Sequence, residues 1–403
     1  MPEFKFNLPA ITALNDDQQL AYDPRISMLI TGGPGSGKTV VTIYRFLRAV
    51  QEKKHLMLFT YNRALIYSIK GTLRDRAEEL FGGFNEEEVN KVVDEQLSTF
   101  YNWHYQQIKY FDAEAKEEEV KKNFKSYAEE NMRFDEILFD EGQDLPRTVY
   151  QNAFILGECI SVGADRAQNY RGHYISEELE DTIFEGLKKQ NTDTERQYLE
   201  ANYRNTKEIF QFAKAFVPED PRVQQMDTEH LRRGNNPEVR DGLAVDAQLE
   251  VLKEIIEANL NSNIGILVHS PEEITTIRLF LQKHEYSCSE NAPLDRSFSY
   301  YYHKMSISDE KAMQKRLSSP FITTFESCKG LEFDVVILPF FERSDIATST
   351  KNDDGRFKAT PSHYYVAVTR ARNDFIVLCN KKPLVLSFYV PPAKSGEDDD
   401  LPF

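Results

Sequence analysis

A glycine-rich stretch near the start of the chain contains the residue types needed to hold a nucleoside triphosphate. The octapeptide GGPGSGKT, at positions 32–39, fits the pattern G-x-x-x-x-G-K-[ST]. It follows the apolar run at 26–30 and precedes apolar residues at helical spacing, which is the strand–loop–helix setting that this motif requires. Its glycines, Gly35 and Gly37 among them, let backbone N–H groups surround phosphate oxygens. The sequence therefore predicts a phosphate-binding loop.

Two side chains at the end of this loop have defined chemical tasks. The Lys38 ammonium can reach the β- and γ-phosphates, and the Thr39 hydroxyl can ligate Mg²⁺. The N-terminus of the following helix adds positive potential. The alternative, a glycine-rich turn with a chance GKT, does not explain the strand and helix patterns on either side.

An acidic pair farther along the chain fits the second part of such a site. The sequence FDEGQD, at 139–144, follows the apolar run at 136–139. P-loop proteins need carboxylates at the carboxyl end of such a strand. We expect Asp140 to hold Mg²⁺, directly or through water, and Glu141 to polarise the attacking water as general base. The alternative is an acidic surface turn, which the phosphate-binding loop disfavours.

Strands and helices must alternate to bring these residues together. Short apolar runs alternate with helical patterns along the chain, as expected for parallel sheets covered by helices. We therefore predict an α/β fold with two domains and a boundary near Leu199. The predicted strands are at 26–30, 55–59, 136–139 and 160–162 in the first half, and at 264–268, 334–338 and 375–378 in the second.

Three segments lack a strong apolar pattern. Residues 112–130 are rich in charge, with Glu and Lys spaced to pair on one helix face, which predicts a solvated helix, or alternatively a binding surface. Residues 291–313 are irregular and are predicted to form an exposed loop or small insert. The last segment, PPAKSGEDDDLPF, has no period and is predicted to be disordered.

Composition narrows the class of protein. With 403 residues the chain is long enough for two or more domains. A net charge of −16 argues against a generally basic nucleic-acid coat protein but leaves room for a local basic groove. The four cysteines form no CxxC pair, which fits a reducing compartment and no zinc site. The N-terminus resembles no signal peptide and no apolar run has membrane-spanning length, so we expect a soluble, cytoplasmic protein.

The order of motifs resembles that of superfamily 1 helicases, specifically the UvrD/Rep group, through nearly the whole chain. Each short motif alone is weak, and their shared order is what makes the resemblance specific. In addition to the two nucleotide motifs, the matching segments are LNDDQ (14–18, Q motif), LFTYNRAL (58–65, motif Ia), STFYNW (98–103), VGADRAQNY (162–170, motif III), LEANYRN (199–205, motif IV), TTFESCKGLEFDVVIL (323–338, motif V) and YVAVTRAR (365–372, motif VI).

This resemblance implies two RecA-like domains with ATP in the cleft between them, and roles for individual residues. Gln18 would read the adenine edge, Tyr203 would stack on the base, and Glu332 would lie near the ribose. A γ-phosphate held from both domains makes a cleft that closes on ATP and relaxes after hydrolysis. The residues implied to contact the γ-phosphate are Gln168, Arg204 and Arg370, the last as a second arginine finger.

The family resemblance also implies single-stranded DNA as a partner, ATP and Mg²⁺ as cofactors, and 3′ to 5′ translocation. It places the protein in DNA repair, replication or phage-related defence. Trp103, the only tryptophan, could stack on a base, with a core or interface role as the alternative. The candidate DNA-binding residues are Thr60, Tyr61, Asn62, Thr99, Trp103 and Thr324.

The chain departs from the family pattern in ways that favour a second function. Short spacings predict a reduced helical insert at about 74–133 and almost none in the second domain, with domains at 1–198 and 199–393 and a tail at 394–403. Glu326 stands where the family usually has a histidine near DNA. The alternative is an ATP-driven regulatory or sensor subunit of a partner such as a nuclease, without duplex unwinding.

The terminal sequence DDDLPF resembles the tip of bacterial single-stranded DNA-binding protein. A pocket with an apolar floor and a basic lip could hold both the Phe403 ring and its terminal carboxylate. We hypothesise that the tail recruits proteins that recognise that tip, with a solubility tail or an autoinhibitory tail as alternatives. The residues involved would be Asp398, Asp399, Asp400, Leu401, Pro402 and Phe403.

Overall fold

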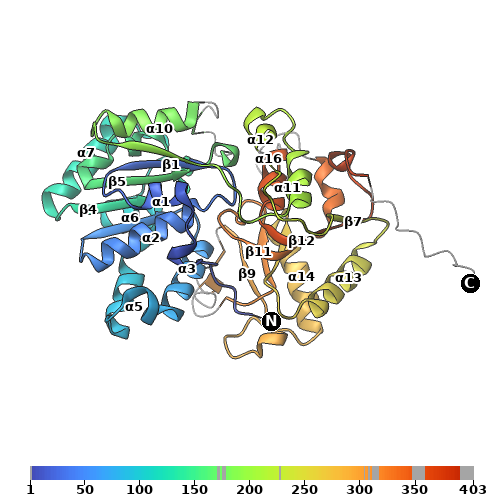
Figure 1. The fold of residues 1–403 in the computed structure, drawn as a ribbon. Coiled ribbons are helices and arrows are strands. Elements are labelled where there is room, and N and C mark those ends of the chain that lie inside the picture. The colour runs from blue at the N-terminus through green and yellow to red at the C-terminus, as the bar shows by residue number, and fades with distance from the viewer. Residues whose placement is uncertain are drawn as a thin grey trace, which may run out of the picture.

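Two α/β domains, each built on a six-stranded sheet, lie side by side in the computed structural model (Figure 1). Neighbouring strands in both sheets are parallel, so the predicted α/β fold with two parallel-sheet domains is confirmed. The predicted tail, including the six residues 398–403, lies outside the described residues. The structure describes residues 2–169, 173–174, 178–226, 228–303, 305–306, 309–310, 317–346 and 359–390, without the side chains of Arg222, Asp345 and Ile346.

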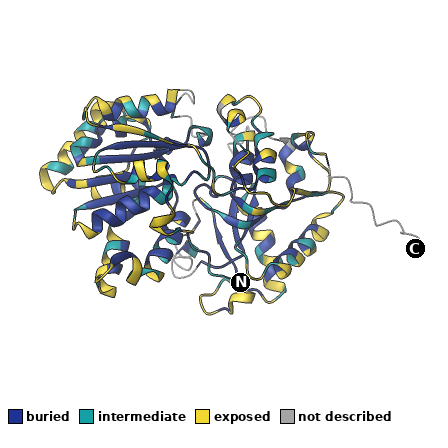
Figure 2. Ribbon diagram, in the orientation of Figure 1, coloured by how far each residue is buried: buried dark blue, intermediate teal, exposed yellow. Residues whose placement is uncertain are grey.

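The first sheet has the strand order β3-β2-β4-β5-β1-β6. Every residue of β1 and β2 is buried, because helices cover both faces of the sheet (Figures 1 and 2). The strands are β1 (Met28–Gly32), β2 (Leu56–Thr60), β3 (Leu97–Thr99), β4 (Phe134–Phe139), β5 (Gly157–Ala164) and β6 (Glu195–Leu199). The helices are α1 (Asp16–Tyr22), α2 (Lys38–Gln51), α3 (Arg63–Asp75), α4 (Ala77–Phe81), α5 (Glu86–Glu95), α6 (Phe100–Gln107), α7 (Glu117–Glu130), α8 (Arg147–Tyr150), α9 (Ala153–Leu156) and α10 (Leu179–Lys188).

The second sheet has the order β7-β12-β11-β8-β10-β9. Helices α11 and α16 lie on one side of β11 and β12, and α13 and α14 lie on the other (Figure 1). The strands are β7 (Glu238–Arg240), β8 (Ile264–Val268), β9 (Ser299–Tyr301), β10 (Phe321–Thr324), β11 (Phe333–Leu338) and β12 (Ala371–Leu378). The helices are α11 (Lys207–Lys214), α12 (Pro221–Gln225), α13 (Val245–Ala258), α14 (Pro271–Lys283) and α16 (Pro361–Val368).

Two weakly patterned segments contribute more to packing than expected. The predicted exposed loop at 291–313 contains β9, whose three residues are buried at the edge of the second sheet, where they pair with β10. Of the two alternatives, an exposed loop or a small insert, the exposed loop is wrong at β9, because a buried strand of three residues is too short to leave an apolar run in the sequence. The predicted solvated helix at 112–130 is α7, and its Val120 and Phe124 are buried against the first domain.

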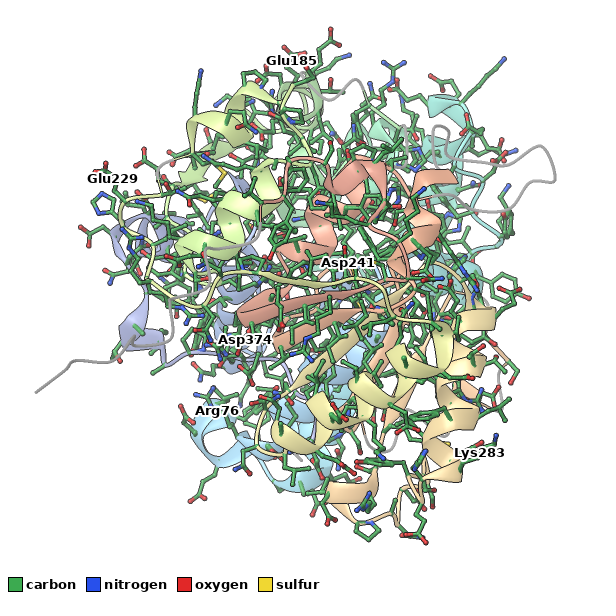
Figure 3. The ribbon with its side chains drawn as sticks, turned by 90° about the vertical axis from the view of Figure 1, so that its right-hand side faces the viewer. Arg76, Glu185, Glu229, Asp241, Lys283 and Asp374 are labelled. Atoms are coloured by element: carbon green, nitrogen blue, oxygen red, sulfur yellow. The ribbon has the colours of Figure 1, made fainter. Side chains whose placement is uncertain are left out.

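Charged side chains cover the outside of the molecule. Seen from the side of the second domain, Asp241, Lys283 and Asp374 lie around its sheet and helices (Figure 3). None of the helices in the described part of the chain has the length and apolar character needed to cross a membrane.

Candidate active site

The glycine-rich loop runs from the end of β1 into α2 in a conformation that only glycine adopts easily. Gly35 has φ 74° and Gly37 has φ 93°, both in the left-handed region. A Cβ at Gly37 would lie 2.3 Å from Gln18 Nε2, and one at Gly35 would lie 2.4 Å from Asn202 Oδ1. Both positions therefore require glycine for backbone conformation and for space.

The predicted phosphate and metal ligands lie together at this loop. The Lys38 ammonium curls back over the loop and donates to the carbonyls of Gly32 and Gly33, at 2.7 and 2.8 Å. The Thr39 hydroxyl donates to Asp140 Oδ2 at 3.0 Å, so the two expected Mg²⁺ ligands meet across the ends of α2 and β4. Burial, and then repulsion by Glu141, raise the pKa of Asp140 to about 7. A bound divalent cation would favour the ionised carboxylate there.

Glu141 is turned out of the line of β4 by an unusual backbone conformation. Its φ of 59° is left-handed, which is uncommon for a residue other than glycine and persists only where the surroundings hold the backbone in place. Its carboxylate is buried and accepts a hydrogen bond from Gln143 Nε2 at 2.6 Å. This conformation places the predicted general base at the edge of the pocket rather than inside the first sheet.

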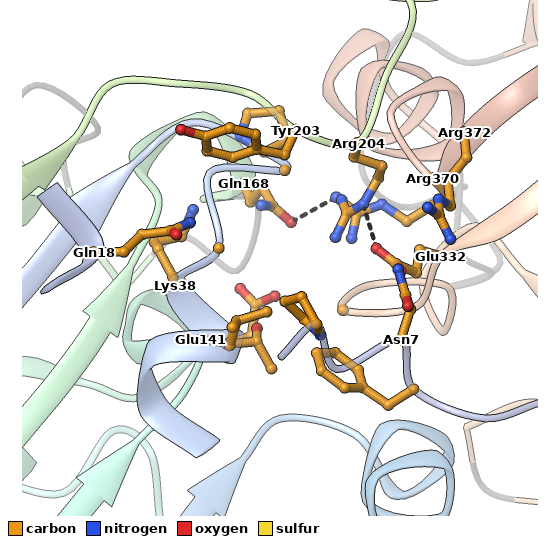
Figure 4. Close-up of a pocket in the computed structure, with 18 of the residues that line it drawn as sticks. Asn7, Gln18, Lys38, Glu141, Gln168, Tyr203, Arg204, Glu332, Arg370 and Arg372 are labelled. Atoms are coloured by element: carbon orange, nitrogen blue, oxygen red, sulfur yellow. Dashed lines mark hydrogen bonds and ion pairs between the residues drawn. The ribbon is translucent and has the colours of Figure 1, made fainter. Parts of the chain in front are cut away.

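Two arginines face this loop from the opposite side of the pocket (Figure 4). Arg204 Nε donates to Glu332 Oε2 at 3.0 Å, and Arg370 Nη2 lies 3.5 Å from Gln168 Oε1. Burial, and then the neighbouring Arg370 guanidinium, lower the pKa of Arg204. The guanidinium groups of Arg204 and Arg370 repel each other, so an anion bound between them would be stabilised.

The base end of the pocket is formed by Gln18 and Tyr203. The Gln18 side chain donates to the Ser36 carbonyl of the loop at 2.9 Å and also caps α1 with Asn15. The Tyr203 N–H donates to the Gly35 carbonyl at 2.9 Å, and 55% of Tyr203 is exposed, which leaves a ring face open for stacking. The cavity has a volume of about 310 Å³.

The structure brings the expected nucleotide residues to one pocket. The predicted residues that line it are Gln18, Gly35, Gly37, Lys38, Thr39, Glu141, Gln168, Tyr203, Arg204, Glu332 and Arg370, with Asp140 directly behind Thr39. Sequence reasoning missed Arg372, although it lies within the quoted motif, and the N-terminal residues Phe6, Asn7 and Pro9, for which the sequence held no signal.

Sequence reasoning also missed Lys329, which connects the two domains. Its side chain is fully buried, and its ammonium donates to Asp144 Oδ2 at 2.7 Å and to the Gln168 carbonyl at 3.0 Å. The same ammonium lies 3.7 Å from Glu141 Oε2. Asn62 donates to the Lys329 carbonyl. Lys329 therefore links the second domain to the turn that carries Glu141.

A larger cavity, of about 650 Å³, adjoins Lys329 between the domains. Of the predicted DNA-binding residues, Tyr61, Asn62 and Thr99 line this groove, whereas Thr60, Trp103 and Thr324 do not. Asn62 and Thr99 also cap the helices α3 and α6. Glu326 is half-buried and is not among the side chains that line the groove.

The aromatic surface of the groove comes from tyrosines rather than from Trp103. Only 5% of Trp103 is exposed, and its ring packs against Phe59 at a centroid distance of 5.2 Å, which favours the core role over base stacking. Tyr105 and Tyr110 line the groove and are 67% and 76% exposed. Tyr61, Tyr101, Tyr301 and Tyr302 also line it.

Comparison with known proteins places these motifs in a family. Residues 14–319 match the UvrD/REP helicase N-terminal domain, and residues 269–382 match the UvrD-like helicase C-terminal domain. No curated protein matches the chain. Among solved structures, the C-terminal domain of a possible DNA helicase from Lactobacillus plantarum WCFS1 is similar at 16% identity, over 46% of this chain and 93% of that one, with a TM-score of 0.30. That score is too low to bear on the fold, so the two domain matches carry the assignment.

The position of Lys329 yields a prediction about stability. Lys329→Met should lower the free energy of unfolding by about 3 kcal/mol, because it leaves buried carboxylates without their cation. Asp144→Asn in the same chain should restore part of this loss, giving a coupling energy of about 1–3 kcal/mol in a double-mutant cycle measured by urea unfolding. Lys253→Met is the control, since that lysine pairs with the exposed Glu250 of its own helix. A coupling energy near zero would contradict the proposed link.

Proposed function

Because the chain belongs to the UvrD/REP helicase family, we propose that it is an ATP-driven motor that translocates along single-stranded DNA from 3′ to 5′. The observation that carries this proposal is the pocket between the domains, which has phosphate-binding groups on one side and Arg204 and Arg370 on the other. UvrD-like helicases use ATP, usually with Mg²⁺. The polarity and a role in DNA repair, replication or phage-related defence follow from the family resemblance.

ATP hydrolysis would use groups from both walls of the pocket. Lys38, Thr39 and Asp140 would hold the phosphates and Mg²⁺. Glu141 would accept a proton from the attacking water, which Gln168 would help to orient. Arg204 and Arg370 would neutralise the charge that develops on the transferred phosphoryl group. The groups that act on the nucleotide come from both domains, so turnover would depend on how closely the two domains approach.

Nucleotide binding would change the shape of the groove through Lys329. This residue contacts the turn that carries Glu141 on one side and Asn62 of the groove on the other. A closing of the domains around ATP would therefore move the groove wall, and a strand held by stacking on Tyr105 and Tyr110 would be displaced. Repeated closing and relaxing would step the protein along the strand.

A second candidate function is an ATP-driven regulatory or sensor subunit of a partner such as a nuclease. The compact first domain favours it, because only α7 and its flanking loops separate α6 from β4. In this function the same closing of the pocket would alter a partner protein rather than advance along DNA. Strand displacement by the purified protein separates the two functions.

The acidic terminal segment supports a further part of the proposal. We propose that Asp398–Asp400 and Leu401–Phe403 dock proteins that recognise the tip of single-stranded DNA-binding protein, as their sequence resemblance suggests. The charged residues would increase the association rate with a basic rim, and the Phe403 ring would fill the pocket.

ATP turnover tests the roles of the pocket residues. Single-stranded DNA should stimulate ATP hydrolysis by the wild-type protein, and Lys38→Ala or Glu141→Gln should abolish it, because each removes a group that acts on the phosphates or the water. Arg204→Ala and Arg370→Ala should each cost about 2–4 kcal/mol of transition-state stabilisation. Steady-state phosphate release measures all of these effects. Hydrolysis that ignores DNA but responds to a co-purifying protein would support the regulatory function instead.

The groove tyrosines yield a prediction about DNA affinity. Replacing Tyr105 and Tyr110 together by alanine should weaken binding of a fluorescent oligonucleotide by about 2–6 kcal/mol, since stacking contributes about 1–3 kcal/mol per base. Trp103→Phe, a conservative change in the core, should leave affinity unchanged. Equal binding by the double alanine variant and the wild type would show that the strand does not lie in this groove.

The terminal segment is tested by removing it. Deletion of Leu401–Phe403 should abolish capture of a protein known to bind the tip of single-stranded DNA-binding protein, while ATP hydrolysis is retained. Capture that persists after deletion would refute docking. A salt-sensitive rise in DNA-stimulated hydrolysis after deletion would instead indicate an autoinhibitory tail.

A further inference from the structure

The first residues of the chain connect the second domain to the wall of the nucleotide pocket. We propose that the segment from Pro2 to Pro9, here called the N-terminal strap, is a positioning element that keeps the pocket closed and slows nucleotide exchange. This inference rests on the proposed function, because it assumes that the pocket binds ATP. In Figure 1 the N-terminus lies beneath the second domain near β9, and the chain runs from there to the first domain.

Phe4 anchors the start of the strap in the second domain. Its ring stacks on Phe321 of β10 and Phe333 of β11, at centroid distances of 4.9 and 5.0 Å, and only 3% of the residue is exposed. The Phe4 N–H donates to the Leu317 carbonyl at 2.8 Å, and the Ser319 N–H donates to the Pro2 carbonyl at 3.3 Å. The strap is therefore built into the second domain, although it precedes the first domain in sequence.

The following residues are anchored in the first domain. The Phe6 N–H donates to the Ser68 carbonyl at 3.2 Å, and the Thr72 hydroxyl donates to the Phe6 carbonyl at 2.7 Å, both from α3. Farther along, Arg76 donates to the Leu8 carbonyl and the Tyr44 hydroxyl donates to the Pro9 carbonyl. Phe6 and Leu8 are buried with the apolar residues of α3.

Phe4, anchored in the second domain, and Phe6, anchored in the first, are too close in sequence to let the domains separate where the strap joins them. Phe4 and Phe6 are two residues apart, and an extended chain spans at most about 7 Å over that distance. The domains can rotate about the strap, but they cannot move far apart there unless one anchor detaches. Detachment of the first anchor would expose the Phe4 ring to water, which is unfavourable.

The part of the strap that is anchored in the first domain also forms part of the pocket wall. Phe6, Asn7 and Pro9 line the cavity, and Asn7 lies beside Glu332 in Figure 4. The chain then enters α1, whose Gln18 holds the phosphate-binding loop through Ser36. A nucleotide that fills the pocket would therefore lie against the strap, so the strap's attachment to the second domain should affect exchange more than chemistry.

Truncation of the second-domain anchor is the first test. In Phe4→Ala, the rate of release of a fluorescent ADP analogue and the KM for ATP should both rise at least fivefold, while kcat at saturating ATP changes less than twofold. The KM should change more than kcat because no group that touches the phosphates is altered. Phe4→Leu should restore most of the slow release, since it keeps an apolar anchor.

A matched control separates the strap from a general loss of stability. Phe216→Ala removes a phenylalanine of nearly the same burial, 4% exposed, that packs against Tyr364 and Phe388 of the second domain. It should lower thermal stability without changing release. Unchanged release in Phe4→Ala, or equal acceleration in Phe216→Ala, would overturn the proposal. A wild-type protein that does not bind the ADP analogue would instead refute the proposed function.

A disulfide tests the strap in a protein with an intact core. Glu3 and Ser318 face each other across an antiparallel bridge flanked by the hydrogen bonds of Phe4 and Pro2, which is the close, non-hydrogen-bonded kind of pair. Glu3→Cys with Ser318→Cys should, when oxidised, slow ADP release at least threefold relative to the reduced protein, and reductant should restore it. Each single cysteine variant is the control. Identical release in the oxidised and reduced states would overturn the proposal.

Discussion

The arrangement of the two domains depends on buried charged groups that face each other across their interface. Lys329 of the second domain lies between Asp144 and the Gln168 carbonyl of the first, and Arg370 reaches the Gln168 side chain. A buried cation is tolerated only where such partners are present. The distance between Lys38 and the arginines on the opposite wall is therefore determined by pairing at the interface, and so is the size of the pocket between them.

The same constraint explains the strained backbone at Glu141. A left-handed conformation costs a residue with a Cβ about 1–2 kcal/mol, so it persists only where the surroundings require it. Here the Tyr150 hydroxyl donates to the Gly142 carbonyl at 2.7 Å, and Lys329 binds Asp144 two residues farther on. These contacts turn the chain sharply at the end of β4. The carboxylate then faces the interface, where a nucleotide held by both domains would lie.

The sequence predicted most of the nucleotide site because its residues lie in contiguous motifs whose local backbone is nearly self-sufficient. It predicted the fold class because most inner strands carry apolar runs. It missed the edge strands β3, β6, β7 and β9, which are stabilised by pairing rather than by a long apolar run, and also the inner strand β10. The roles of Lys329 and Phe4 could not be predicted from the sequence for a different reason. Each residue links the two domains through partners that are far away in sequence, and neither residue type stands out locally. Trp103 was conspicuous as the only tryptophan, yet its ring completes the core beside Phe59.

An acidic protein can still bind a nucleic acid if charge repulsion and base stacking act over different distances. A net charge of −16 repels a polyanion, but at physiological ionic strength that repulsion is screened beyond about 8 Å. Stacking acts only at contact, and the exposed Tyr105 and Tyr110 rings can supply it whatever the overall charge. Arg63, which lines the same groove, is paired with Glu310 at 2.6 Å and is partly neutralised. Stacking would therefore have to supply much of the affinity of such a groove, and a strand would be held through its bases more than through its phosphates.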